Sequence, residues 1–355
     1  MEIDEYLPTL ESNLELPSVA YGLEASTIVW RALGKAPAPL TPESFIKVLN
    51  RELSAILSVK EQEYVLLTEI SLNCLDLPKS SKREDAEIKF WPHDFPIRYR
   101  QSRTKLLYEN GVSIKPTPEA YCKVTVSVRA KSPGSAFHKA MRALDIQRAL
   151  WCLMTNSVMQ ITFGGGIEKP VNGIRLGSKH TLHTTAGQEA FESIWYEPNF
   201  KETSVFRLKK PRVFLKNSKF AIRRISSCAY GERLSSSLIR YVRALDESDA
   251  NTTFLRLWGA MEALATPGIA NYDNVVKRCS FLYAESAYHR QVLEQLREYR
   301  NASVHAGEES SKARTHCFQM QRYYRDLFWF HIRNAIFFRQ HSRSKLLFGF
   351  SGKFR

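Results

Sequence analysis

The 355-residue sequence contains no closely spaced cysteine pair and no long apolar run. Its six cysteines lie far apart, without a CxxC or CxC pattern, which argues against a zinc knuckle or a dithiol redox motif. Scattered single cysteines are typical of a reducing interior, and the first residues lack the apolar stretch of a secretory signal. No stretch reaches the roughly 18 apolar residues of a membrane span. We therefore expect a cytoplasmic protein without a membrane partner.

Acidic residues are scarce in the second part of the chain. Residues 1–150 hold 20 Lys and Arg against 19 Asp and Glu, whereas residues 151–355 hold 31 against 17. Nearly all of the net charge of +15 therefore belongs to the second part, which points to a polyanion such as nucleic acid as its partner. A merely basic surface is the alternative.

The segment from Thr203 to Gly231 has basic residues and no acidic ones. Its eight cations are Arg207, Lys209, Lys210, Arg212, Lys216, Lys219, Arg223 and Arg224. Phenylalanines are interleaved with them, a composition that suits contacts to the backbone and bases of RNA. A solvated helix between two domains has the same composition. Residues 206–231 are therefore a candidate connecting segment, and the eight cations are candidate RNA-binding residues.

Two kinds of hydrophobic spacing divide the chain. Up to about residue 205, strands such as Tyr64–Ile70 and Tyr121–Val128 alternate with helical stretches, the longest at about Ala136–Asn156. Beyond residue 231 nearly every segment has helical spacing. The predicted arrangement is an α+β N-terminal domain at residues 1–205, an all-α helical bundle at residues 232–341 and a basic tail at residues 342–355.

Metal-binding patterns are also missing. His180 and His183 have metal-like spacing, but on a strand, positions three apart face opposite sides of the sheet. The sequence shows no evident carboxylate cluster that would hold a metal. We expect a protein that uses neither a metal nor a cofactor.

A pattern suited to RNA chemistry lies among the late helices. Arg300 is followed directly by Asn301, and His305 comes five positions after the arginine. Helical spacing precedes this hexapeptide over Ala287–Tyr299 and returns over residues 311–341. These residues, together with LWGAMEAL at Leu257–Leu264, resemble the HEPN superfamily and its Apea-like branch. In that superfamily an Arg-x4–6-His motif lies near the start of a late helix.

The resemblance extends roughly from Glu232 to Phe338 and does not reach the first two hundred residues. It implies a HEPN helical bundle with metal-independent endoribonuclease activity, working as a homodimer whose paired motifs face one another across a cleft. It further implies antiphage defence or toxin-type growth arrest by cleavage of RNA, such as tRNA or mRNA. The N-terminal domain would then sense a phage-derived trigger or regulate the nuclease. The alternative is a HEPN domain without catalysis that binds nucleic acid or protein.

The three residues of the motif suit attack by the RNA 2′-hydroxyl on the adjacent phosphate. His305 can accept or donate the proton near neutral pH, because an unperturbed imidazole titrates at about 6.5. Arg300 stays charged and can bind the phosphate oxygens through its planar fork, while Asn301 orients the site. The alternative is a surface arginine paired with Glu294 or Glu298 and a histidine packed under the last helix.

Helical geometry constrains how this site is built. On one unbroken helix, Arg300 and His305 are about 140° apart, so a single copy does not aim both at one atom. Either the helix begins within the motif or a second subunit completes the site, and we predict the homodimer. Glu262 is a candidate supporting residue that pairs with Arg300, although an exposed charge is equally compatible. Tyr299 either lines the site or belongs to the core, and its spacing favours the core.

Overall fold

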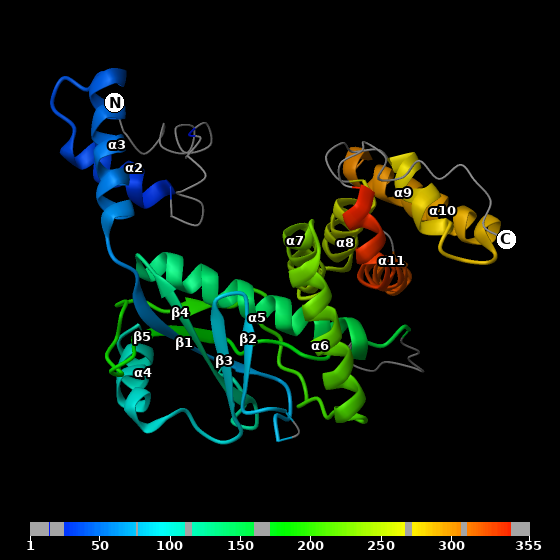
Figure 1. Ribbon diagram of the computed structural model, residues 1–355, viewed down its shortest axis with the longest axis horizontal. Helices are drawn as coiled ribbons and strands as arrows, with labels where there is room; N and C mark the ends of the chain where they lie inside the picture. Colours follow the sequence, from blue (N-terminus) through cyan, green and yellow to red (C-terminus); the bar gives the residue numbers. More distant parts are fainter. Residues whose placement is uncertain are drawn as a thin grey trace.

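The computed structural model shows a mixed α+β protein, with an antiparallel sheet built from strands between residues 62 and 196 and many helices in the C-terminal half (Figure 1). This agrees with the coarse fold expected from the sequence. The structure describes Leu14 and residues 25–75, 77–110, 116–159, 171–266, 272–306 and 311–341. The predicted basic tail at residues 342–355 therefore lies outside the described residues.

Helices follow one another without an intervening strand after residue 210 in the described chain. The helices are α2 (Ala25–Lys35), α3 (Pro42–Ser58), α4 (Ile97–Glu109), α5 (Pro133–Thr155), α6 (Pro211–Ser227), α7 (Gly231–Ala244), α8 (Ala250–Ala265), α9 (Tyr272–Ser280), α10 (Ser286–Ala306) and α11 (Ala313–His341). The strands are β1 (Gln62–Ile70), β2 (Ser80–Arg83), β3 (Ala86–Trp91), β4 (Cys122–Ala130), β5 (Lys179–Thr184) and β6 (Trp195–Tyr196). None of these helices has the length and apolar composition that crossing a membrane requires.

The sheet has the strand order β2-β3-β4-β1-β5-β6, and each neighbouring pair is antiparallel. Strand β1 is central and is buried on both faces. Because side chains alternate along a strand, Leu66 and Ile70 join the main core on the side of α5. Val65 and Leu67 pack on the opposite side, with Tyr99 of α4. Helices α5 and α4 thus cover opposite faces of the sheet.

Helix α5 joins the sheet to the helices of the second half. Its residues from Ala143 to Leu153 are buried, because α5 contacts the sheet as well as α6 and α7. The ring of Trp151 lies 5.6 Å from Phe90 of β3 and 6.0 Å from Phe214 of α6, measured between ring centroids. One continuous cluster of buried side chains therefore runs from the sheet into the helical half.

Buried charges fasten the end of α7 to α5. The carboxylate of Asp246, just after α7, accepts hydrogen bonds from Arg148 of α5 at 2.9 and 2.6 Å and from Asn172 at 2.8 Å. The side chain of Arg148 is fully buried and also contacts Asp145 at 2.9 Å. Arg243 of α7 donates to the other oxygen of Asp145 at 2.6 Å. The helical half is therefore held to the sheet half by paired charges as well as by apolar packing.

The hairpin formed by β2 and β3 is not predicted by the sequence, which suggests a polar link over residues 79–87. In the structure Ala86, Ile88 and Phe90 face the core at alternate positions of β3. The turn between the two strands places Glu84 at a φ of 50°, a left-handed conformation that few residues adopt. The charged residues of this segment lie on an exposed edge strand. The segment therefore lacks the alternation of apolar and polar residues that indicates a strand in a sequence.

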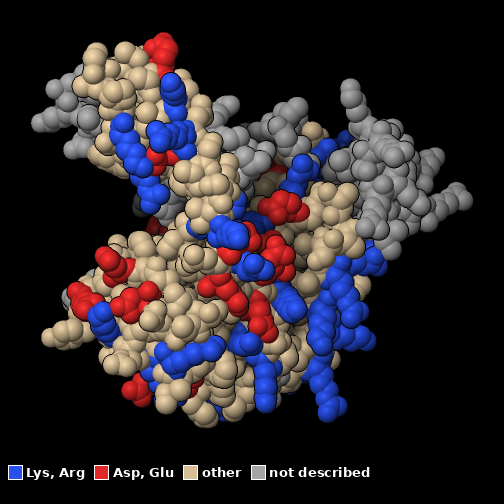
Figure 2. All heavy atoms as spheres, turned by 60° about the vertical axis from the view of Figure 1, so that its left-hand side comes forward, with Lys and Arg blue, Asp and Glu red and all other residues tan. Residues whose placement is uncertain are grey.

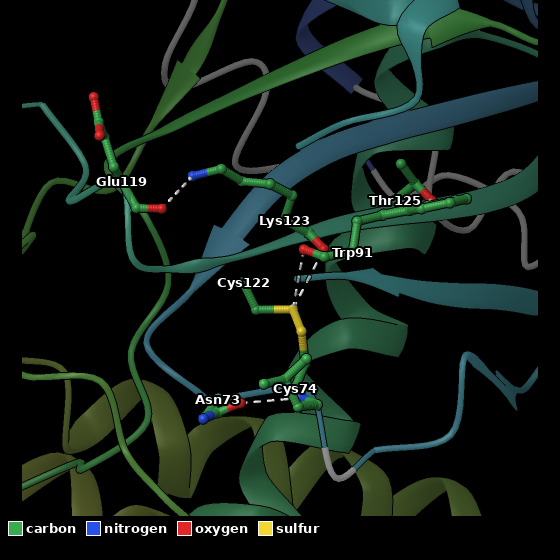
Figure 3. The surroundings of a disulfide bond; sticks show 8 residues. Asn73, Cys74, Trp91, Glu119, Cys122, Lys123 and Thr125 are labelled. Carbon is green, nitrogen blue, oxygen red and sulfur yellow. Dashed lines mark hydrogen bonds between the residues drawn. A yellow bond between two sulfur atoms is a disulfide. The ribbon is translucent and has the colours of Figure 1, made fainter. Parts of the chain in front are cut away.

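Two of the six cysteines form a disulfide, which corrects the expectation that all of them are single. Cys74 follows β1 and Cys122 begins β4, and their Cα atoms are 6.0 Å apart (Figure 3). The distance allows a bond although 48 positions separate the residues in sequence. The other four cysteines are buried thiols. Burial raises the pKa of Cys152 to about 12, so this thiol is a packed, unreactive group.

Candidate active site

The Arg300–His305 hexapeptide occupies the last turns of α10. The sequence predicts a helix that ends at Tyr299, but α10 continues to Ala306, so the motif lies at the end of a helix rather than near its start. Because α10 is continuous through the motif, the helix does not begin within it. Residues five apart on such a helix project about 140° apart. The side chain of His305 lies outside the described part of the chain.

Arg300 is half-buried between α10 and α8. Its Nη1 donates a hydrogen bond to Oδ1 of Asn301 at 3.1 Å. Glu262, on α8, is near enough for the charge of Arg300 to act on its carboxyl. Burial raises the pKa of Glu262 above its usual value, and the positive charge of Arg300 works in the opposite direction. The structure thus brings Arg300, Asn301 and Glu262 together.

The surroundings of Glu262 distinguish it from an ordinary surface acid. Its Oε1 is buried and accepts no hydrogen bond from the described residues. Leaving a buried polar atom unsatisfied costs about 1–3 kcal/mol, so such atoms in native proteins call for an explanation. The proximity of Arg300 supplies one, because its positive charge favours the ionised form of this carboxyl. The alternative of an exposed charge does not describe Glu262.

The alternative partner Glu294 is already engaged. Its carboxylate pairs with Nη2 of Arg297 at 2.7 Å on the same helix. Arg297 also forms an ion pair with Asp273 of α9. Arg297 therefore links Glu294 of its own helix to Asp273 of α9.

Tyr299 packs at the edge of the core, as its spacing suggests. Its ring centroid lies 4.7 Å from that of Phe254 on α8 and 4.9 Å from that of His316 on α11. Its hydroxyl donates a hydrogen bond to the side chain of Asn251. These contacts place a second imidazole, that of His316, beside the residue that precedes Arg300. No spacing in the sequence singles out His316, because eleven positions separate it from His305.

The candidate RNA-binding residues lie on or just before α6, which is a packed helix rather than a solvated link. Phe214, Ala221 and Ile225 form its buried face. Arg207, Lys209, Lys210, Arg212, Lys216, Lys219 and Arg223 are exposed, and the guanidinium of Arg224 lies 5.3 Å from the ring centroid of Phe220. In Figure 2, Lys and Arg predominate along one edge of the visible face, whereas acidic and basic residues are interleaved elsewhere. Figure 1 shows α6 near the sheet and α10 at the far end of the helical half.

The ring nitrogens of His180 and His183 contact other side chains. Nδ1 of His180 lies 2.7 Å from the hydroxyl of Thr68, and its Nε2 lies 3.1 Å from the carboxylate of Glu197. His183 instead contacts the Ser102 hydroxyl at 3.0 Å through Nδ1. No group of three metal-binding side chains occurs among the described residues. Both histidines are satisfied core groups of β5.

The burial of His183 makes stability depend on pH. Its pKa is lowered to about 4, because burial disfavours the charged ring and Arg103 repels it. An unfolded histidine has a pKa of about 6.5, so the unfolded chain binds a proton that the folded chain excludes, and stability falls as the pH drops from about 6.5 to about 4. Between about pH 7.5 and about pH 5 we expect His183 to account for a loss of about 2 kcal/mol.

Urea denaturation at both pH values measures this loss. The His183→Gln variant carries no titrating ring at this position, so its free energy of unfolding should depend less on pH by that amount. If the variant keeps the full pH dependence of the wild type, His183 does not titrate as its burial requires.

Comparison of the chain with protein-family models, with curated proteins and with solved structures gives no match.

Proposed function

We propose that this protein is a metal-independent endoribonuclease of the HEPN type, in which Arg300, Asn301 and His305 form the active site. The observation that carries the proposal is the placement of Arg300. It is half-buried, donates a hydrogen bond to Asn301 at 3.1 Å and lies near enough to the half-buried Glu262 of α8 for its charge to act on that carboxyl. A guanidinium positioned in this way is suited to bind a phosphate, because its planar fork presents paired donors.

In the proposed reaction the substrate supplies its own nucleophile. His305 removes the proton from a ribose 2′-hydroxyl, and the oxygen forms a bond to the adjacent phosphorus. The bond from phosphorus to the 5′-oxygen breaks, and that oxygen takes up a proton. Arg300 stabilises the negative charge that accumulates on the phosphate oxygens. The products are a 2′,3′-cyclic phosphate and a 5′-hydroxyl.

A homodimer is part of the proposal. Helix α10 is continuous from Ser286 to Ala306, so Arg300 and His305 of one chain diverge by about 140° around its axis. A second copy that presents its own motif brings an arginine and a histidine to the same phosphate. By the resemblance to Apea-like HEPN proteins, the RNA is a cellular species such as tRNA or mRNA. Its cleavage arrests growth during phage infection, and the sheet half senses the trigger.

The test is cleavage of mixed cellular RNA in the presence of EDTA. We expect the wild type to cleave and to leave 2′,3′-cyclic phosphate ends. His305→Ala should be slower by about 10²-fold or more, since general acid–base catalysis contributes that much. His93→Ala is the matched control, because His93 is exposed and lies outside the motif.

Two outcomes would remove the enzymatic proposal. One is a wild type that does not cut RNA, and the other is equal cleavage by His305→Ala. Tight RNA binding without cleavage would instead favour a HEPN module that has no catalytic activity.

A further inference from the structure

A groove of about 850 Å³ lies between the end of α5, α6 and α11. We call it the α6–α11 groove. Four of its lining residues are cations, namely Lys209, Lys210, Arg325 and Arg333. Four others are aromatic residues, namely Phe206, Phe214, Phe220 and Trp329. Among the described residues that line the groove there is no Asp or Glu. A negatively charged occupant would therefore meet no acidic side chain in this described lining.

The cations of the groove are available to an anion. Lys209, Lys210 and Arg333 are exposed, and Arg325 is half-buried with a long contact of 3.4 Å to Asp326. Phe220 is 40% exposed although it lies on a helix with a well-formed buried face. An exposed phenylalanine beside exposed lysines is typical of a surface that contacts both the charged and the planar parts of a ligand.

We propose that the α6–α11 groove binds single-stranded RNA, and this inference rests on the proposed function in that RNA is the substrate. The cations contact backbone phosphates, and unpaired bases stack on Phe220 and Trp329. An A-form duplex does not fit this chemistry, because its bases are stacked on one another and offer no free face. Charge alone would attract any polyanion, whereas the aromatic side chains select for exposed bases.

Helix α11 connects the groove to the motif. His316, near the start of α11, packs on Tyr299, the residue before Arg300. Trp329 lies on the same helix, and at about 1.5 Å per residue it is about 20 Å further along the axis. The groove therefore holds RNA about 20 Å from the neighbourhood of Arg300 as measured along α11. A substrate long enough to occupy both places gains binding energy that a short one lacks.

The experiment measures fluorescence anisotropy of a labelled single-stranded RNA with the full-length chain carrying His305→Ala, so that cleavage does not interfere. Lys209→Ala/Lys210→Ala is compared with Arg51→Ala/Lys60→Ala, an equal change of charge at exposed positions of α3 and the residues after it. We expect the groove variant to bind at least tenfold more weakly. The logarithm of the binding constant falls as the logarithm of the salt concentration rises. This fall should be less steep by about 1.4 for the groove variant, the value for two phosphate contacts to a single strand.

A second pair of variants tests stacking. Phe220→Ala should weaken binding by about fivefold or more, since stacking on an aromatic ring contributes at least that factor per base. Tyr108→Ala is the control, because Tyr108 is 86% exposed on α4 and lies outside the groove. Circular dichroism verifies that each variant is folded. A duplex of the same sequence should bind more weakly than the single strand and should respond little to Phe220→Ala.

Three results would overturn the inference. They are groove variants that bind like their controls, duplex that binds as tightly as single strand, and an acidic peptide that competes as well as RNA. The outcome for catalysis is separate. If the wild type does not cleave RNA but the groove variants lose single-strand binding, only the nuclease proposal falls. If it cleaves and the groove variants bind normally, only the groove falls.

Discussion

Replacing Asp246 with alanine is expected to lower the free energy of unfolding by about 3–5 kcal/mol, the usual cost of removing one partner from a buried ion pair. Arg148 would remain fully buried with Asp145 as its charged neighbour. Burial alone would raise the pKa of the Asp246 carboxyl, but the charges of Arg148 and Arg175 lower it below its usual value. The carboxylate is thus ionised in the folded protein, and its loss leaves Arg148 to share Asp145 with Arg243, so positive charge is in excess in this buried cluster.

Chemical denaturation of the wild type and of Asp246→Ala measures this effect. Asp94→Ala is the control, because it removes an acid from an ion pair with Arg100 in which both side chains are more than half exposed. That variant should change stability by less than about 1 kcal/mol. A similarly small loss for Asp246→Ala would show that the charges between α5 and α7 do not hold the two halves together.

Exchange of Arg300 for lysine is expected to reduce the rate of RNA cleavage by about 10²–10³, the cost of losing one well-placed donor to a developing oxyanion. Lysine keeps the charge but lacks the planar fork that binds two oxygens at once. Arg297→Lys is the matched control, since it makes the same exchange on α10 at a residue that is paired with Glu294 and Asp273. Equal rates for the two variants would contradict the role proposed for Arg300.

Glu262 is expected to act through Arg300. Glu262→Gln keeps the shape of the side chain and removes the charge that opposes the guanidinium. Displacing a catalytic group by about 1 Å costs up to about 10²-fold in rate, so kcat should fall while KM changes little. Glu298→Gln, at an exposed position of α10, serves as the control. A change in KM alone would assign Glu262 to substrate binding instead of positioning.

Local signals in the sequence predict the elements whose causes are local. The helix start at Thr41-Pro42 is an example, because the side chains of Thr41 and Ser44 cap each other's backbone amides within four residues. The long final helix, expected over residues 311–341, is confirmed as α11. In both cases spacing and end signals lie within the element itself.

Elements that depend on distant partners are not predicted. Helix α4 buries Arg103, which no hydrophobic pattern would place inside a protein. The structure explains its burial by an ion pair with Glu69 of β1 at 2.7 Å and by the ring of Phe95, whose centroid lies 4.8 Å from the guanidinium. Glu69 is 34 positions away in sequence, so its proximity appears only after the chain has folded.

The same distinction applies to the candidate sites. Arg300 and Asn301 are adjacent in sequence, and the resemblance supplies Glu262 on a second helix. Sequence also identifies the cations of α6. It does not pair them with Trp329 or Arg325, because the α6–α11 groove is assembled from segments more than a hundred residues apart. A surface of this kind has no signature in a linear pattern.

On helix α6, the residues that contribute to folding are different from the residues that carry positive charge. Phe214, Ala221 and Ile225 anchor one face in the core, while the lysines and arginines project from the other. Exposed cations on a well-anchored helix contribute little to folding. The number of positive charges on α6 can therefore drift or be redesigned, and the attraction for a polyanion adjusted stepwise, while the scaffold that holds the rest of the molecule stays unchanged.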